Sequence, residues 1–95
     1  MKRFVHKVPG GKLICVKIQE EAGIIKYIQY TGDFFMAPEG DLEDLEAVLL
    51  GQKTEKDSVK KTIIDFFARK KTVIAGASAD VFAFVLIQAL NTDDT

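Results

Sequence analysis

Hydrophobic and polar residues alternate along the first third of the chain, and the alternation predicts three β-strands. Residues 4–8, 13–18 and 24–31 place apolar side chains, many of them Val or Ile, at alternate positions. This period of two is typical of strands that bury one face. The side chains expected to share a face are Ile14, Val16 and Ile18 in the second strand and Ile24, Ile28 and Tyr30 in the third.

Two short polar segments separate these strands. Residues 9–12 read PGGK and residues 20–23 read EEAG, so each contains glycine, which adopts the positive φ angles of tight turns. Connections this short join antiparallel neighbours. The first third of the chain is therefore predicted to be a three-stranded meander, and such a sheet needs helices over its apolar face.

The apolar spacing then changes to a helical period. Residues 42–50 are expected to form a helix with Asp41 as its N-cap and Gly51 at its end. A second helix is expected to start near Thr54, with Asp57 completing an imperfect capping box. Its apolar stripe consists of Val59, Ile63, Phe66 and Phe67.

The last predicted helix, residues 79–90 with Ser78 as its cap, is apolar on every side. Only two of its twelve residues are polar, and Val81, Phe84 and Ile87 lie away from the face that the other apolar residues form. A helix of this kind must be covered all round. A chain of 95 residues with three helices on one sheet has little material for such cover, so we expect this helix to take part in an interface.

These elements predict an α+β fold, a three-stranded antiparallel meander followed by about three helices packed on the sheet. The length of 95 residues fits a single domain, residues 1–95. The net charge of −1 produces no overall field that favours nucleic acid or an anionic membrane. The lone cysteine, the absence of a signal peptide and the absence of a membrane-length apolar run point to a cytoplasmic protein.

No residue pattern indicates a catalytic, metal or cofactor site. His6 is the only histidine and has no nucleophile or metal partner near it in sequence, and Cys15 reads as a buried, inert thiol within a strand. Residues 10–12 lead into a strand, unlike a phosphate loop, and the carboxylates of residues 39–46 lack the spacing of a calcium loop. The lysines of residues 53–71 are interleaved with acids, as on a solvated helix face.

The segment that follows the third strand contains an unusual aromatic pair. Gly32 permits an uncommon backbone angle, and Asp33 can accept backbone hydrogen bonds in a turn. Phe34 and Phe35 then lie in a loop. They either fold back onto the core or face a partner.

This segment, in its sequence context, resembles a known family. The run GDFF at residues 32–35, the acidic helix DLEDLEAVLLG at 41–51, and the hairpin around 11–18 and 23–26 are similar to the C-terminal accessory domain of lipoate–protein ligases. The resemblance extends from about residue 11 to residue 90. Because the chain starts at Met1 without a catalytic domain before it, it resembles the separate accessory subunit of a split, archaeal-type ligase.

The resemblance implies a non-catalytic subunit that is inactive alone and docks on the catalytic subunit of a lipoate–protein ligase. The complex would use ATP, Mg²⁺ and lipoate to form lipoyl-AMP and then acylate a lysine of lipoyl-domain proteins, which this chain would meet only indirectly. The resemblance transfers no catalytic residue. The candidate partner-interface residues are Gly32, Asp33, Phe34, Phe35, Val81, Phe84 and Ile87.

Three other functions remain open from the residues themselves. The last helix could be the seam of a homo-oligomeric interaction module. Cys15 could serve a small scaffold in sulfur or iron–sulfur transfer, although iron–sulfur sites usually take several cysteines. The lysines of residues 53–71 could form a patch that attracts nucleic acid, with strongly salt-dependent affinity.

Overall fold

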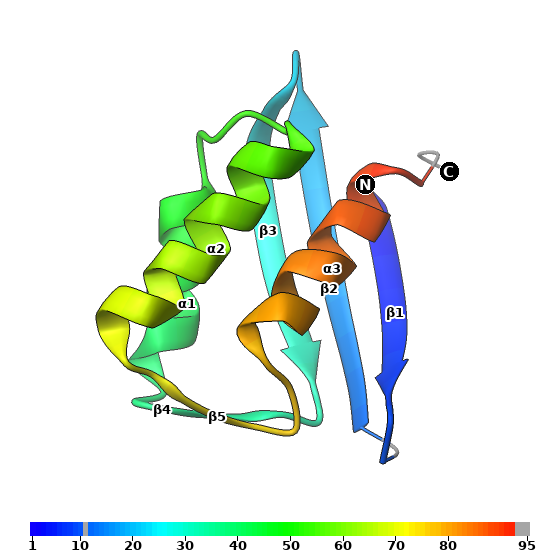
Figure 1. Cartoon of the computed structure of the whole chain (residues 1–95). Helices are drawn as coiled ribbons and strands as arrows, with labels where there is room; N and C mark the ends of the chain where they lie inside the picture. Colours follow the sequence, from blue (N-terminus) through cyan, green and yellow to red (C-terminus); the bar gives the residue numbers. More distant parts are fainter. Residues whose placement is uncertain (11, 93–95) are drawn as a thin grey trace.

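The computed structural model describes residues 1–10 and 12–92 and shows an antiparallel sheet with helices on one of its faces (Figure 1). The elements are β1 (Lys2–Val8), β2 (Lys12–Glu21), β3 (Ile24–Gly32), β4 (Phe35–Ala37), α1 (Gly40–Leu49), α2 (Lys56–Lys70), β5 (Val73–Ala75) and α3 (Ala79–Leu90). The sheet order is β1-β2-β3, and a separate two-stranded sheet pairs β4 with β5. The α+β prediction of a meander followed by three helices is confirmed.

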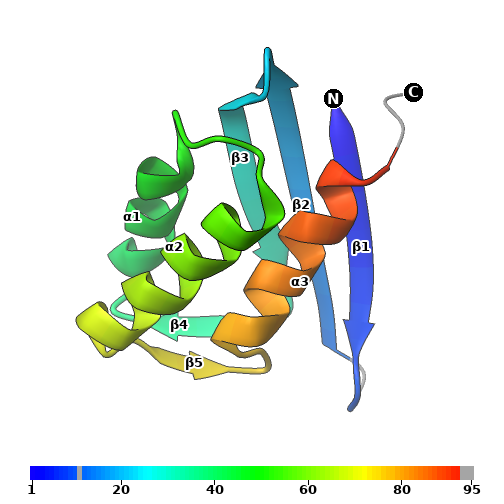
Figure 2. The same ribbon diagram turned by 45° about the horizontal axis from the view of Figure 1, so that its top comes forward.

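The helices cover the sheet unequally. Helix α1 packs against β3, and α3 packs against β1 and β2, while α2 lies against both α1 and α3 (Figures 1 and 2). The core between these layers includes the predicted β2 face and the whole predicted stripe of α2. Helix α3 is therefore bordered by the sheet on one side and by α2 on another.

The turn between β2 and β3 is shorter than predicted. Strand β2 continues to Glu21, and Ala22 and Gly23 make a two-residue turn with φ angles of 51° and 75°. Positive φ at both central residues matches the right-handed twist of a two-residue hairpin.

A β-bulge in β3 corrects the predicted buried face of that strand. Gln19 pairs with Tyr27 but Glu20 pairs with Ile25, so Lys26 is the extra residue. An extra residue reverses the alternation, so the side chains before it take the opposite faces from those expected by counting back from the residues after it. As a result Ile25, which is 1% exposed, enters the core, and the prediction that Ile24 does so is wrong.

The N-cap predicted for α1 is also wrong. The helix begins at Gly40, which places Asp41 inside its first turn. The Asp41 side chain is buried, and its Oδ2 accepts a 2.6 Å hydrogen bond from the hydroxyl of Thr72. The carboxylate thus ties α1 to the segment that follows α2, a role that depends on a residue 31 positions away.

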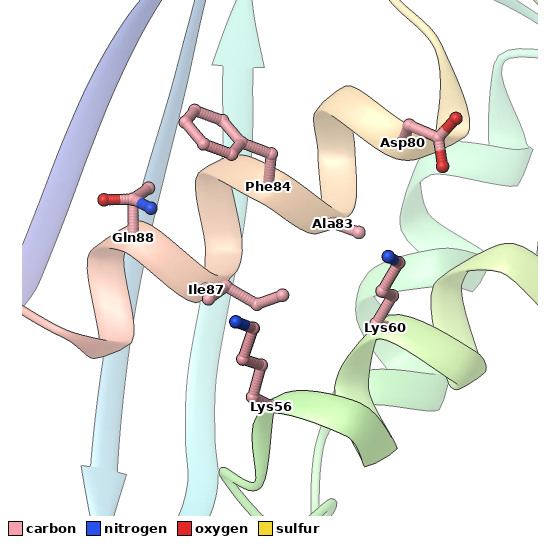
Figure 3. Close-up of a pocket in the computed structure, with 7 residues that line it drawn as sticks. All are labelled: Lys56, Lys60, Asp80, Ala83, Phe84, Ile87 and Gln88. Atoms are coloured by element: carbon pink, nitrogen blue, oxygen red, sulfur yellow. The ribbon is translucent and has the colours of Figure 1, made fainter.

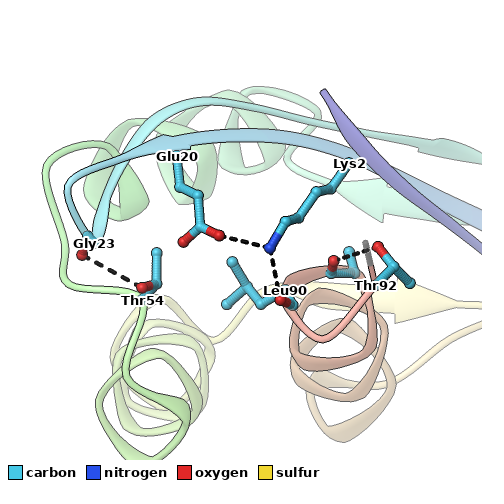
Figure 4. Close-up of polar contacts among 7 residues, drawn as sticks. Lys2, Glu20, Gly23, Thr54, Leu90 and Thr92 are labelled. Atoms are coloured by element: carbon cyan, nitrogen blue, oxygen red, sulfur yellow. Dashed lines mark hydrogen bonds and ion pairs between the residues drawn. The ribbon is translucent and has the colours of Figure 1, made fainter. Parts of the chain in front are cut away.

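The predicted capping box of α2 is absent, whereas the cap of α3 is confirmed. Helix α2 begins at Lys56 and has no side-chain cap, and the Thr54 hydroxyl donates instead to the carbonyl of Gly23 at 3.4 Å (Figure 4). At α3, the Ser78 Oγ accepts a hydrogen bond from the N–H of Val81. Ser78 has extended backbone angles, as an N-cap requires.

An ion pair fixes the C-terminal end of α3 to the sheet. The Lys2 Nζ donates to Glu20 Oε1 at 2.6 Å and to the carbonyl oxygen of Leu90 at 2.9 Å (Figure 4). A cation at the last carbonyls of a helix satisfies acceptors that have no partner within the helix. The first strand and the last helix are thereby joined.

Phe82 is the centre of an aromatic cluster. Its ring centroid lies 4.9 Å from that of Tyr30, 5.1 Å from that of Phe34 and 5.6 Å from that of Phe67. The Tyr30 hydroxyl donates a 2.8 Å hydrogen bond to the Phe82 carbonyl oxygen, and burial raises the Tyr30 pKa well above its ordinary value, with the Glu46 charge adding to the rise. The cluster joins α3, α2, β3 and the loop after β3.

Candidate interaction surface

Helix α3 is covered more completely than its sequence suggested. The sheet and α2 together bury the expected inner residues and also Ile87, which is 8% exposed, so the expectation that Ile87 lies on an uncovered face is wrong. Val81 is half-buried. Phe84 alone of the three predicted outer residues stays open, with 43% of its surface exposed.

Phe84 belongs to an aromatic group at the edge of the sheet. Its ring lies edge-on to His6, with centroids 5.1 Å apart, and edge-on to Phe4 at 6.3 Å. His6 also stacks on Phe4. His6 is therefore part of an aromatic contact between β1 and α3, which agrees with the structural role expected for it.

A groove runs between α2 and α3 beside Phe84 (Figure 3). Its volume is about 360 Å³, near the lower end of the range for small-molecule sites. Helix α2 supplies its cationic wall and α3 its largely apolar floor. The lining residues are Lys56, Lys60, Asp80, Ala83, Phe84, Ile87 and Gln88.

The two lysines of this groove have no partner among the residues that the structure describes. Lys56 and Lys60 lie one helical turn apart, both are exposed, and neither makes an ion pair or hydrogen bond with another described residue. By contrast, Lys70 on the same helix pairs with Asp44 at 3.1 Å. The groove thus presents two ammonium groups, neither paired within residues 1–10 and 12–92, beside apolar surface.

Gly32 and Asp33 have structural roles at the end of β3. A side chain on Gly32 would place its Cβ 2.2 Å from the Leu13 carbonyl oxygen, and the Gly32 φ angle is 147°. Asp33 accepts a hydrogen bond from the Leu13 N–H through Oδ2 and donates its own N–H to the Leu13 carbonyl at 2.8 Å. These contacts, all within this chain, hold the end of β3 against β2.

The two phenylalanines of the GDFF segment take opposite positions. Phe34 folds back onto Phe82, while Phe35 is 57% exposed and lies in β4, paired with Ala75 of β5. Folding back onto the core is therefore confirmed for Phe34, whereas a partner contact of Phe35 stays a prediction. Phe35 lines a second, smaller hollow with Met36, Glu39 and other residues, and this hollow shares no residue with the α2–α3 groove.

Cys15 lies on the side of the sheet that faces away from the helices. It pairs with Val5 and Thr31 in the two neighbouring strands and is half-buried, so the expectation of a buried thiol is wrong. Because Ile14 and Val16 point to the core, strand alternation requires Cys15 to point outward.

Glu46 closes the outer edge of the sheet. Its Oε2 accepts a 2.7 Å hydrogen bond from the Tyr30 N–H on β3, an edge strand. Partial burial raises the pKa of Glu46, the hydrogen bond from Tyr30 lowers it, and the nearby Glu43 charge raises it again, with a net upward shift. The Glu46 carboxylate therefore accepts the hydrogen bond of the Tyr30 N–H, while its surroundings make its ionised form less favourable than in water.

Replacing Glu46 with glutamine is expected to flatten the pH dependence of stability. A pKa raised in the folded state means that the stabilisation is fully present below the unfolded-state pKa and is lost as the pH rises through the folded-state pKa. The glutamine side chain keeps an acceptor for the Tyr30 N–H without ionising, so the variant should gain on the wild type between acidic and neutral pH. The gain should be below about 1 kcal/mol because solvent screens a partly exposed group.

Urea unfolding of both proteins at several pH values measures this difference. Glu43→Gln is the matched control, since it removes the neighbouring charge that raises the Glu46 pKa. In a protein that carries Glu43→Gln, the stability gained by adding Glu46→Gln should be smaller. A wild-type protein that becomes more stable than Glu46→Gln as the pH rises would contradict the prediction.

The described residues contain no group of three or more His, Cys, Asp or Glu side chains placed to hold a metal ion. No helix in the same part of the chain is both long and apolar enough to cross a bilayer.

The structure separates the predicted interface residues into different places. Phe35 and Phe84 are open, Phe34, Val81 and Ile87 are partly or fully covered, and Gly32 and Asp33 support the backbone. The groove residues Lys56 and Lys60 were not among the predicted interface residues. Their spacing of four on a predicted helix was a usable signal, but only the packing of α2 on α3 places them beside Phe84.

The comparisons with known proteins agree with this fold. The family model described as bacterial lipoate protein ligase C-terminus matches residues 2–84. A solved structure, from an analysis of an archaeal lipoylation system, "a bi-partite lipoate protein ligase and its E2 lipoyl domain from Thermoplasma acidophilum", is 32% identical with a TM-score of 0.71. The match covers 97% of this chain and 93% of the other.

No curated protein matches the sequence at a significant level. The family resemblance seen in the sequence is nevertheless confirmed by the family match and by the structural similarity, which extend from β1 into α3 and beyond. The chain therefore belongs to the family of lipoate protein ligase C-terminal domains.

Proposed function

We propose that this chain is a non-catalytic accessory subunit of a lipoate–protein ligase that docks on a separate catalytic polypeptide. The observation that carries the proposal is the near full-length similarity, at 32% identity, to a chain from a ligase described as bi-partite. Because the match covers 93% of that chain, the two are alike in extent as well as in fold.

The surface of the protein supports a docking role. Phe84 and Phe35 are large aromatic side chains left open on a small domain, and aromatic side chains are enriched where protein interfaces gain most of their affinity. A domain of 95 residues also gains stability from a bound partner by mass action.

Docking would act on the activation step by shifting a population. The accessory chain would bind more tightly to a catalytic conformation that holds ATP, Mg²⁺ and lipoate in place, and the activation cannot exceed this difference in affinity. The complex would then form lipoyl-AMP and transfer the lipoyl group to lipoyl domains. The unpaired thiol of Cys15 fits the reducing setting of the cytoplasm.

Adding this chain to the candidate catalytic polypeptide should raise the rate of lipoyl-AMP formation at least about tenfold. Lowering the free energy of the active conformation by about 1.4 kcal/mol relative to the inactive one has that effect. The product is measured by mass spectrometry with ATP, Mg²⁺ and lipoate present, and complex formation is followed by size-exclusion chromatography with light scattering. Each polypeptide alone provides the baseline.

Co-elution of the two chains without any change in lipoyl-AMP would contradict a role in activation. A stable homodimer that does not bind the catalytic polypeptide would instead favour the interaction-module function, since exposed Phe84 could equally serve a contact between two copies.

A further inference from the structure

We infer that the α2–α3 groove receives an acidic segment of the catalytic polypeptide, with a carboxylate near Lys56 and an apolar side chain on Phe84. This inference rests on the proposed function, because it names the surface and the chemistry through which that docking occurs.

The groove carries its charge on one wall and its apolar surface on the other. In Figure 3 the Lys56 and Lys60 side chains extend from α2 toward α3, with Ile87 between the Lys56 ammonium and the helix. Neither lysine is neutralised within the described chain. A carboxylate can pair with the lysines of α2 while a neighbouring apolar side chain packs on α3, so a segment that carries both groups fits the groove.

The ends of the groove are chemically different. Asp80 lies at the N-terminal end of α3 on the Lys60 side, and Gln88 lies one helical turn beyond Phe84 toward the Lys56 side (Figure 3). The Asp80 carboxylate repels an incoming anion, whereas the Gln88 amide can donate to it. The carboxylate of the partner is therefore placed at the Lys56 end of the groove.

A second copy of this chain is a poorer occupant than the catalytic polypeptide. Its acidic segment is α1, where Asp41 binds Thr72, Glu46 binds the Tyr30 N–H and Asp44 pairs with Lys70. Three of the five acids of residues 39–46 are thus already engaged, which leaves only Glu39 and Glu43 of this segment for a groove on a second copy.

The double substitution Lys56→Glu with Lys60→Glu tests the inference. Both residues are exposed, and a glutamate in the first turn of α2 interacts favourably with the positive end of the helix dipole. The fold should therefore be retained. Binding to the catalytic polypeptide, measured by isothermal titration calorimetry, should weaken by about tenfold or more, and the salt dependence of the affinity should fall.

A matched control separates this groove from general electrostatic attraction. Lys7→Glu with Lys26→Glu makes the same change in net charge at exposed positions of the sheet, away from α2 and α3. It should change the affinity by less than about threefold, because it removes no contact in the groove. Phe84→Ser should weaken binding without altering its salt dependence.

The outcomes distinguish the two proposals. If the wild-type chain does not bind the catalytic polypeptide, the proposed function fails. If the wild type binds and the groove variant binds as tightly as the control variant, the function stands and the groove is excluded as the docking site. If the groove variant instead loses a homodimer that the wild type forms, a second copy is the occupant and the inference is overturned.

Discussion

Replacing Phe82 with alanine should destabilise the protein by about 3–5 kcal/mol, the range for removing a fully buried aromatic ring. Phe82 is completely buried and touches the rings of Tyr30, Phe34 and Phe67, which come from different parts of the chain. The loss is large against the total stability of about 5–15 kcal/mol expected of a small domain. Urea unfolding followed by circular dichroism measures it.

Phe84→Ala is the matched control, since it removes the same ring from the same helix two residues away. Phe84 is 43% exposed and touches only the edges of Phe4 and His6 among the aromatic rings, so the expected cost is about 1–2 kcal/mol. Equal costs for the two variants would show that Phe82 does not organise the core in the way its contacts indicate.

Replacing Gly32 with alanine should cost about 2–4 kcal/mol, from backbone strain together with a backbone clash. The new Cβ would lie 2.2 Å from the Leu13 carbonyl oxygen and 3.0 Å from the Ile14 Cα. Because these are backbone atoms of the central strand, the clash cannot be relieved by rotating a side chain. The hydrogen bonds between Asp33 and Leu13 should be disturbed as well.

Gly40→Ala tests whether this cost is specific to the position. Gly40 is the first residue of α1, and a Cβ there would meet nothing within 4 Å. Alanine loses less backbone entropy on folding than glycine, so this variant should be neutral or more stable by up to about 1 kcal/mol. A Gly32→Ala protein as stable as Gly40→Ala would refute the close contact between β2 and β3. Thermal unfolding of the two variants side by side gives the comparison.

Local patterns were sufficient where one residue and its near neighbours settle the conformation. The alternation in residues 13–18, the stripe of α2 and the Ser78 cap each depend on contacts within a few positions, and all are confirmed. The predicted caps at Asp41 and Thr54 failed because each side chain found a partner far away, Thr72 in one case and Gly23 in the other. Nothing near either residue in sequence identifies that partner.

The short strands β4 and β5 show the same limit. Each has three residues, and an isolated run of that length has no periodicity to distinguish it from a loop. They become strands only because Met36 and Ile74, which pair across the small sheet, are brought together by the packing of α1 and α2. The bulge at Lys26 likewise depends on the Ile25 contacts with Gly51 and Gln52.

The order of the three long strands and the three helices, the α+β class and the membership of the ligase family could therefore be read from the chain, because periodicity and short motifs are local properties. The proposed docking surface could not. Whether an apolar residue on α3 is covered depends on where α2 lies, and this packing buries Ile87, leaves Phe84 open and places Lys56 and Lys60 beside it. Long-range packing fixes which side chains remain exposed, and it therefore decides which surface is open to the proposed partner.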